Sequence, residues 1–270
     1  MKIELKNISV SYEKGHPILK DISLKFNEGG IYGILGPNGS GKTTLLKAIS
    51  GILPYEGKIM FDDKDLSSLS RKNIARRIAL MPQFSSIYFT YTVKDTVLLG
   101  RYAHRGNSFR DILSDSSSDD KKIVNEVLEM TGLSDIANSL LSELSGGQMQ
   151  RVLLARTIAQ ETPVILLDEP TNHLDLRFHQ ELMNYLKDWA SKSTTVDNVT
   201  HKNTVIAVFH DIGTAASVSD NIVLLNDGKV TKEGPADKIL VRDNLKDIYG
   251  IDVFDYYEGI HKRLSELDKG

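Results

Sequence analysis

The stretch GPNGSGKTT at residues 36–44 constrains the fold of this chain more than any other sequence feature. An apolar run at 30–35 precedes it, and leucines at helical spacing follow it. Glycine lets successive backbone N–H groups curl around phosphate oxygens, and the helix that follows adds the positive end of its dipole. The pattern G-x-x-x-x-G-K-[ST] between a strand and a helix therefore predicts a phosphate-binding loop.

The polar groups of this loop have different expected roles. Lys42 is expected to reach the β- and γ-phosphates of a nucleotide, and the hydroxyl of Thr43 to ligate Mg²⁺. A glycine-rich turn that happens to precede a lysine is the alternative, and the flanking strand and helix disfavour it. The predicted nucleotide-binding residues are Gly36, Pro37, Asn38, Gly39, Ser40, Gly41, Lys42, Thr43 and Thr44.

Composition excludes several other classes of protein. The 270 residues carry a net charge of −3, which gives no basic footprint for nucleic acid. The chain has no cysteine, so disulfides and thiolate metal sites are excluded. No apolar run approaches the ~18 residues that span a bilayer, and the N-terminus lacks the apolar block of a signal peptide. We therefore expect a globular chain without a membrane span.

Strand-like and helix-like patterns alternate along the chain, which favours a largely parallel sheet with helices on its faces. Amphipathic stretches around 2–12 and 18–26 predict strands at an antiparallel edge. The middle, about 84–162, is dominated by helical patterns. The expected fold class is α/β, with one domain in which 1–83 and 163–270 form the core and the middle forms a helical subdomain.

Four shorter stretches carry local predictions. Residues 226–228 read Asn-Asp-Gly between apolar runs and predict a hairpin turn. The serine- and aspartate-rich stretch at 114–120 predicts a solvated loop. The polar connector at 191–203 predicts a surface loop, and 252–270 predicts a short tail.

A second functional motif is VILLDEP at 164–170. Its apolar residues predict a buried strand whose end delivers two adjacent carboxylates, Asp168 and Glu169. Asp168 would hold the Mg²⁺ shell, and Glu169 would orient and deprotonate an attacking water. A strand that ends in a polar turn is the alternative, and the phosphate-binding loop in the same chain disfavours it.

A third motif, LSGGQ at 144–148, places two glycines at the start of a further helix. This arrangement predicts a second anion-binding helix start, which has no lysine of its own. A simple helix cap at the serine is the alternative. The residues expected to bind phosphate here are Ser145, Gly146, Gly147 and Gln148.

With these three motifs in this order, the chain resembles the ATP-binding cassette family over about residues 2–250. The resemblance implies a P-loop ATPase core, ATP and Mg²⁺ as ligands, and ATP hydrolysis. It also implies that the LSGGQ motif binds the γ-phosphate of ATP held by a partner subunit. One chain carries a single P-loop and a single such motif, so we expect a dimer with two composite sites, most simply of identical chains.

Further site residues follow from the resemblance. Tyr12 matches the aromatic residue that stacks on adenine, although a tyrosine at a strand end is also compatible with ordinary packing. Gln83 matches the glutamine that senses Mg²⁺ and the attacking water. His210 matches the histidine that contacts the γ-phosphate, and Asp175 matches the loop that communicates across the dimer.

The resemblance also implies partners and a location. Transmembrane permease subunits would form the pathway, a substrate-binding protein would act indirectly, and the ATPase would sit at the cytoplasmic face of the membrane. The segment 84–105, with Tyr88, Phe89 and Tyr91, is either subdomain core or the docking surface for the permease.

Finer resemblance concerns the cargo and the direction of transport. The blocks at 66–83 and 144–183 resemble ATPase subunits of iron-chelate, haem and cobalamin importers. The alternatives are a soluble cassette ATPase of iron–sulfur cluster assembly and the ATPase of an exporter. No residue of such an ATPase touches cargo, so the cargo rests on analogy alone.

Overall fold

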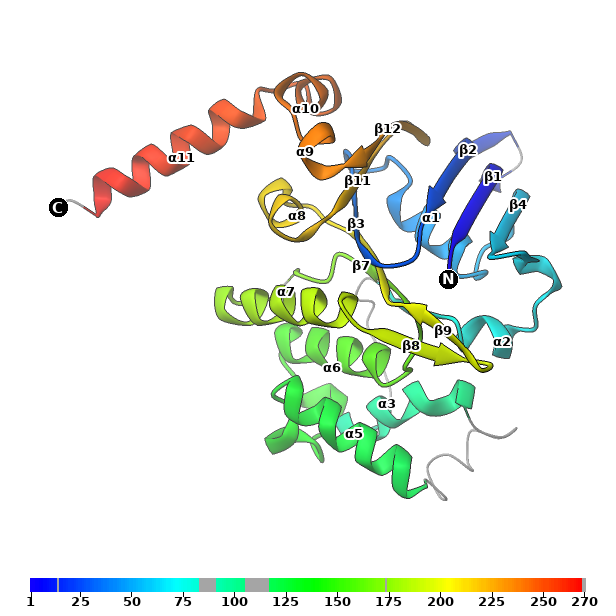
Figure 1. Ribbon diagram of the computed structural model, residues 1–270. Coiled ribbons are helices and arrows are strands. Elements are labelled where there is room, and N and C mark those ends of the chain that lie inside the picture. Colours follow the sequence, from blue (N-terminus) through cyan, green and yellow to red (C-terminus); the bar gives the residue numbers. More distant parts are fainter. Residues whose placement is uncertain (14, 83–90, 105–116, 173, 269–270) are drawn as a thin grey trace.

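The computed structural model describes residues 1–13, 15–82, 91–104, 117–172 and 174–268. Figure 1 shows two sheets on one side of the molecule and a group of helices beside them, with the last helix leading away from the body. Among the described residues, no helix combines the length and the apolar character that a membrane span needs.

The larger sheet holds the strands of the expected core. Its strand order is β12-β11-β3-β10-β7-β6, and only β12 runs antiparallel to its neighbour. This sheet confirms the predicted parallel core, and the β11–β12 turn confirms the predicted hairpin, with positive φ at Asp227 and Gly228. The strands are β3 (Gly30–Leu35), β6 (Ile78–Met81), β7 (Val164–Asp168), β10 (Thr204–Val208), β11 (Asn221–Asn226) and β12 (Lys229–Pro235).

The smaller sheet is antiparallel, with the strand order β2-β1-β4-β5. Its first two strands pair along their length, from Ile3 opposite Phe26 to Glu13 opposite His16. This sheet confirms the antiparallel strands predicted near the N-terminus. The strands are β1 (Ile3–Glu13), β2 (His16–Phe26), β4 (Glu56–Phe61) and β5 (Lys64–Asp65).

Helices connect the strands. Between residues 91 and 158, the elements that the structure describes are α-helices and short 3₁₀ turns. The α-helices are α1 (Lys42–Ile49), α2 (Arg71–Ala75), α3 (Val93–Leu98), α5 (Ser118–Met130), α6 (Gly146–Ile158), α7 (Leu176–Ala190), α8 (Ile212–Val218), α9 (Ala236–Ile239), α10 (Arg242–Tyr249) and α11 (Val253–Leu267). The 3₁₀ turns are η1 (Leu66–Ser68), η2 (Leu99–His104), η3 (Ser134–Ile136) and η4 (Leu141–Glu143).

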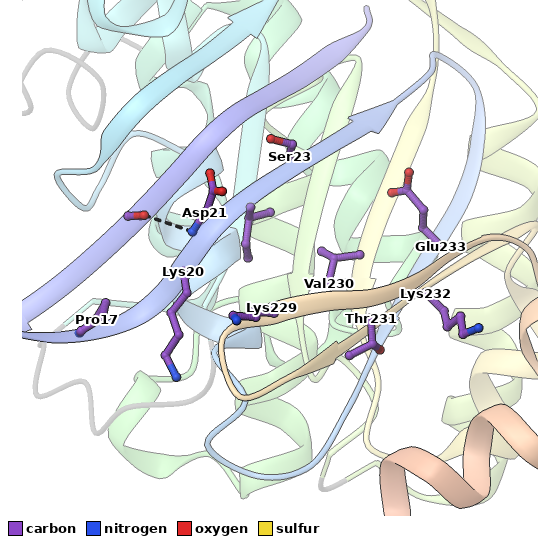
Figure 2. A pocket seen from close by; sticks show the side chains of 11 residues that line it. Pro17, Lys20, Asp21, Ser23, Lys229, Val230, Thr231, Lys232 and Glu233 are labelled. Carbon is purple, nitrogen blue, oxygen red and sulfur yellow. Dashed lines mark hydrogen bonds between the residues drawn. The ribbon is translucent and has the colours of Figure 1, made fainter.

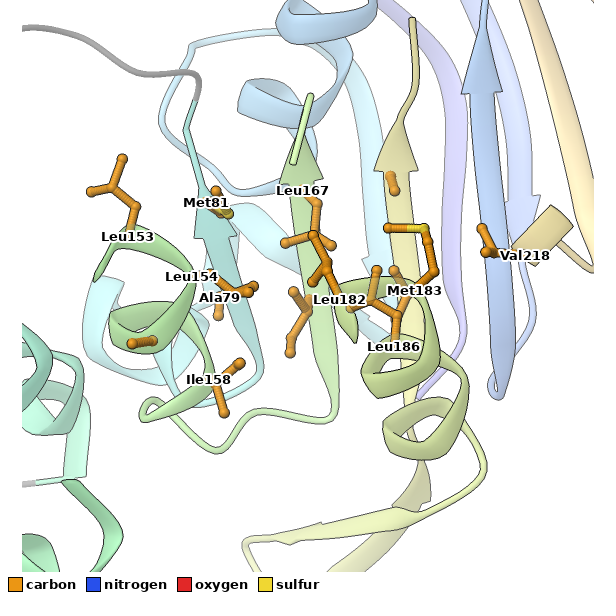
Figure 3. Packing of buried hydrophobic residues seen from close by; sticks show 14 of the residues in the cluster. Ala79, Met81, Leu153, Leu154, Ile158, Leu167, Leu182, Met183, Leu186 and Val218 are labelled. Atoms are coloured by element: carbon orange, nitrogen blue, oxygen red, sulfur yellow. The ribbon is translucent and has the colours of Figure 1, made fainter. Parts of the chain in front are cut away.

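The core has one part on each face of the larger sheet because side chains alternate along a strand. On β7, Val164 and Leu166 belong to the part that contains α1 and the smaller sheet. Ile165 and Leu167 belong to the other part, which contains α6 and α7. Figure 3 shows this second part, in which Leu154 and Ile158 of α6 and Leu182, Met183 and Leu186 of α7 cover the strands.

The connector at 191–203 is not the predicted surface loop. It forms a hairpin of β8 (Ser193–Val196) and β9 (Val199–Lys202), which pair antiparallel. Asp197 and Asn198 both have positive φ, as a two-residue hairpin turn requires. Asp197 also pairs with Arg77, and this ion pair ties the turn to the end of α2. The prediction failed because both strands are rich in polar residues, which are also typical of loops.

Two further stretches contain helices. Helix α5 begins at Ser118, so the predicted solvated loop at 114–120 is wrong at its end, while 114–116 lie outside the described residues. The Ser117 hydroxyl accepts a hydrogen bond from the Asp120 N–H and caps this helix. The predicted tail after 252 forms the 15-residue helix α11, which Asp252 caps.

Candidate functional site

The predicted phosphate-binding loop lies at the carboxyl end of β3 and leads directly into α1. Its first residue, Gly36, has φ 155°, and a Cβ there would lie 1.9 Å from the carbonyl oxygen of Leu225. Gly41 has φ 101° just before α1, and its Cβ would lie 2.7 Å from Leu19. Glycine is required at both positions because the backbone passes so close to its neighbours. By contrast, a Cβ at Gly39 would meet no atom within 4 Å.

Lys42, the first residue of α1, folds back over this loop. Its Nζ donates hydrogen bonds to the carbonyl oxygens of Gly36 and Pro37, both at 2.8 Å. Burial lowers the pKa of the Lys42 ammonium, and the nearby Glu169 and Asp168 carboxylates counteract this effect. A buried cation with two neutral carbonyl partners is suited to binding an anion, such as a nucleotide phosphate.

Thr43 and Asp168 bring two oxygen ligands together. The Thr43 hydroxyl donates a hydrogen bond of 3.0 Å to the Asp168 carboxylate, which lies at the end of β7. The alternation along β7 turns Asp168 toward α1, on the side opposite to Leu167. Burial raises the pKa of Asp168, and the hydrogen bond from Thr43 counteracts this effect. A hydroxyl beside a carboxylate fits the oxygen ligands that Mg²⁺ prefers.

Glu169 has an unusual backbone conformation, with φ 56°. Its N–H donates to the carbonyl of Val208 at 3.2 Å, and its own carbonyl accepts from the Gln150 side chain at 3.2 Å. This turn directs the carboxylate to His210, whose Nε2 lies 2.5 Å from Glu169 Oε1. The Asn172 amide donates to the other carboxylate oxygen at 2.6 Å.

These residues meet because parallel strands end at the same edge of the sheet. In register, Val208 of β10 lies beside Ile34 of β3 and Asp168 of β7. A cavity of about 490 Å³ opens at this edge. It is lined by Tyr12, Ile18, Asn38, Gly39, Gly41, Lys42, Thr43, Thr44, Glu169 and His210.

Most of the predicted nucleotide-binding residues therefore surround one cavity. Tyr12 lies at its rim with 58% of its surface exposed, as a platform for a planar ring requires. Ser40 belongs to the loop but does not line the cavity. Its hydroxyl is buried and has no hydrogen-bond partner among the described residues. Gln83 lies outside the described residues, so its predicted role stays a prediction.

The LSGGQ motif lies elsewhere. Ser145 caps α6 by accepting from the Gln148 N–H at 3.3 Å, and the Gln148 side chain accepts from the Ser145 N–H at 2.9 Å. Neither Ser145 nor its glycine neighbours line the cavity beside Lys42. Asp175 also lies outside that cavity, and its carboxylate caps α7 by accepting from the Phe178 N–H at 2.8 Å. In one chain, the two predicted phosphate-binding motifs thus do not line the same cavity.

Three residues at the site were not predicted from the sequence. Ile18 of β2 lines the cavity, Asn172 holds the Glu169 carboxylate, and Gln150 holds the Glu169 backbone. Asn172 follows VILLDEP by two residues, so its position in the sequence could have indicated that it lies near Glu169. Ile18 and Gln150 approach from distant segments, which no local pattern reveals.

A larger hollow of about 830 Å³ lies between β2 and β12 (Figure 2). The lysines Lys20, Lys229 and Lys232 and the acids Asp21 and Glu233 contribute to its lining. Its lining shares no residue with the cavity beside Lys42, and no predicted site residue contributes to it. Size alone therefore does not identify the functional site.

Known proteins are similar to this chain in sequence. A family model described as ABC transporter matches residues 19–172. The petrobactin import ATP-binding protein YclP of Bacillus subtilis is 32% identical over 252 residues, which cover 93% of this chain and 94% of that protein. The hemin import ATP-binding protein HmuV of Bordetella pertussis is 34% identical over 261 residues, with 93% of each chain covered. The chain spans only 51% and 55% of the length of two further relatives.

A solved structure has the same fold. It is described as a dimeric post-hydrolysis state of the ATP-binding cassette MJ0796 bound to ADP and Pi. Its TM-score is 0.74 at 31% identity, over 87% of this chain and 98% of that one. With the P-loop geometry and the matched family model, these likenesses establish that the chain belongs to the ATP-binding cassette family and is an ATPase.

Proposed function

We propose that this chain powers an importer that takes up an iron chelate, haem, cobalamin or a similar metal-related compound through a separate membrane permease. The observation that carries the proposal is the near full-length similarity to YclP and HmuV, which are named for petrobactin import and hemin import. The chain would act at the cytoplasmic face of the membrane, bound to its permease, while a substrate-binding protein acts indirectly.

In this proposal, the cavity beside Lys42 holds ATP. Tyr12 stacks on the adenine, the loop from Gly36 to Thr44 binds the phosphates with its N–H groups, and Lys42 neutralises their charge. Thr43 and Asp168 hold Mg²⁺, with Gln83 as a further ligand. Held there, Mg²⁺ would supply positive charge against the negative charge that develops on the phosphates.

In the proposed mechanism, Glu169 accepts the proton and His210 positions the reacting groups. The Glu169 carboxylate orients a water molecule and accepts its proton as the water attacks the γ-phosphorus, while the bond to the β–γ bridging oxygen breaks and ADP leaves. Asn172 and His210 hold that carboxylate from two sides, so its orientation is set before ATP binds. His210 is 43% exposed at the cavity, and its other contact would be the γ-phosphate itself.

A second copy of the chain would complete each site. The LSGGQ residues Ser145 to Gln148 do not line the cavity of their own chain, and in this proposal they bind the ATP of a partner. Asp175, at the start of α7, would communicate between the two sites. The unit is then a dimer related by a two-fold axis, because two identical chains close that arrangement.

An apolar hollow of about 310 Å³ is the proposed docking place for the permease. It lies beside β6, and β6 leads into residues 83–90. Ile52, Ile74 and Leu80 line it, and Ile52 is 62% exposed. Such an exposed apolar hollow fits a short apolar helix of a partner. Of the three aromatic residues predicted to dock or to pack, Tyr91 is partly buried, and Tyr88 and Phe89 lie outside the described residues.

Co-purification tests the proposal. The tagged chain, extracted from membranes in mild detergent, is expected to bring with it a protein with several membrane spans. Ile52→Glu is expected to reduce this recovery about tenfold, because it places a charge in the apolar hollow. Ile251→Glu is the matched control, because Ile251 is 56% exposed outside the hollow. Recovery of soluble scaffold proteins instead of a permease would contradict the importer.

A further inference from the structure

The side chain of Tyr257 on α11 contacts the segment that follows His210. Tyr257 donates a hydrogen bond of 2.6 Å from its hydroxyl to Asp211 Oδ1, and the same hydroxyl accepts from the Gly213 N–H at 3.1 Å. Asp211 directly follows His210 in the chain. A phenol from the last helix therefore binds the segment that carries the proposed γ-phosphate histidine.

The contact is part of a wider network. Asp211 Oδ2 accepts from both the N–H and the hydroxyl of Thr214, at 2.5 and 2.6 Å, and so caps α8. The Thr214 hydroxyl in turn lies 3.3 Å from the His179 Nε2 on α7. Burial raises the pKa of Asp211, but these hydrogen bonds outweigh burial and leave the pKa lowered. The carboxylate is therefore charged, which strengthens the bond from Tyr257.

Arg242 of α10 holds the N-terminal end of α11 in place. Arg242 of α10 pairs with Asp252 at 2.6 Å and with Asp255 at 2.5 Å, and its guanidinium lies 5.5 Å from the Phe254 ring centroid. A Cβ at Gly213 would lie 3.5 Å from the Tyr257 hydroxyl, so α8 and the Tyr257 side chain are already in close contact. Beyond this point α11 leads away from the body (Figure 1).

We propose that Tyr257 is a positioning residue for ATP hydrolysis, which fixes the His210 segment through Asp211 and so sets the approach of the imidazole to Glu169 and to the γ-phosphate. This inference rests on the role proposed above for His210. Tyr257 itself does not line the cavity, so it contributes to turnover and not to ATP binding. Burial and the Asp211 carboxylate raise the pKa of Tyr257 to about 12, so the phenol keeps its proton.

The variant Tyr257→Phe tests the proposal, because it removes the hydroxyl and keeps the ring. The expected result is a fall in kcat for ATP on the order of 3- to 10-fold, with KM within about twofold of the parent. Tyr256→Phe is the matched control, since Tyr256 is 59% exposed and its hydroxyl makes no hydrogen bond to the residues that the structure describes. It is expected to keep the parent rate and melting temperature.

A double-mutant cycle with His210→Ala tests whether the effect of Tyr257→Phe on kcat depends on His210. If Tyr257 acts through His210, Tyr257→Phe causes no further loss in the His210→Ala chain. An equal loss in both backgrounds, or a parent-like Tyr257→Phe beside an impaired His210→Ala, would overturn the inference and leave the proposed function standing. A parent-like His210→Ala would instead overturn the role of His210 and the inference with it.

Discussion

Glu169 has a backbone conformation that glutamate does not favour. Its φ of 56° lies in the left-handed region, and it precedes Pro170, which normally pushes the preceding residue toward extended backbone. Such a conformation costs on the order of 1–3 kcal/mol and persists only where surrounding contacts impose it. Here Val208, Gln150 and Asn172 provide those contacts. This strained backbone conformation directs the Glu169 carboxylate into the cavity, where the proposed general base is needed.

Asp168 gives a prediction about stability. Its carboxyl group is 2% exposed, and burial raises its pKa, so the charged form is disfavoured in the nucleotide-free chain. Asp168→Asn still accepts the hydrogen bond from Thr43 but removes the buried charge. It is expected to raise the melting temperature by about 2–4 °C at pH 7.5 while greatly slowing ATP hydrolysis. Differential scanning calorimetry with a parallel ATPase assay measures both effects.

The size of this effect depends on pH. Because the folded-state pKa of Asp168 is raised, its protonated form stabilises the fold, and that contribution is lost as the pH rises through the raised pKa. The advantage of Asp168→Asn should therefore be full well above that pKa and shrink as the pH falls toward the ordinary value of about 4. An advantage that stays constant across this range would contradict the assignment to the buried charge.

At the residue scale, the sequence predicted the groups that a local motif fixes. Lys42 and Thr43 follow from the loop–helix spacing, and Asp168 from the end of an apolar strand. Gln150 was missed because its contact with the Glu169 carbonyl joins α6 to the end of β7. Tyr257 was missed because its partner, Asp211, lies 46 positions away in the chain.

The junction of β3 with α1 gives a prediction at the scale of elements. Gly36→Ala would place a methyl group 1.9 Å from the Leu225 carbonyl oxygen of β11, so the loop or the strand must move. We expect a loss of stability of about 3 kcal/mol, measured by urea denaturation.

Gly39→Ala is the matched comparison, because its methyl group meets no atom within 4 Å and only its φ of 78° is unfavourable. It is expected to cost about 1 kcal/mol. Equal losses for the two variants would mean that backbone conformation, and not the contact with β11, requires glycine at residue 36.

Among the elements, apolar strands were predicted well and polar ones poorly. β7 and β10 are buried on both faces, so their sequences are continuous apolar runs. β8 and β9 are largely exposed and carry threonine and lysine, so their sequence resembles a loop. α11 was missed because only Val253 of its residues is buried, which leaves little apolar signal for a packed helix.

For the whole molecule, the central feature is the separation of the two predicted phosphate-binding motifs. Lys42 begins α1 at the cavity, whereas Ser145 caps α6 and does not line the cavity. The sequence predicted both motifs and the need for a partner, but not the surface on which each lies. That separation is what a pair of chains with shared sites requires, and it makes ATP-dependent dimerisation the central claim of the proposed function.

Light scattering on Glu169→Gln tests that claim most directly. Glutamine keeps the shape of the side chain but cannot accept the proton from water, so ATP stays bound and the dimer should persist. With ATP and Mg²⁺ we expect twice the 30.1 kDa mass of one chain, and with ADP a single chain. Adding Ser145→Arg, which blocks the LSGGQ surface, should return the ATP-bound variant to a monomer. A mass of 30.1 kDa for Glu169→Gln in saturating ATP would contradict the account.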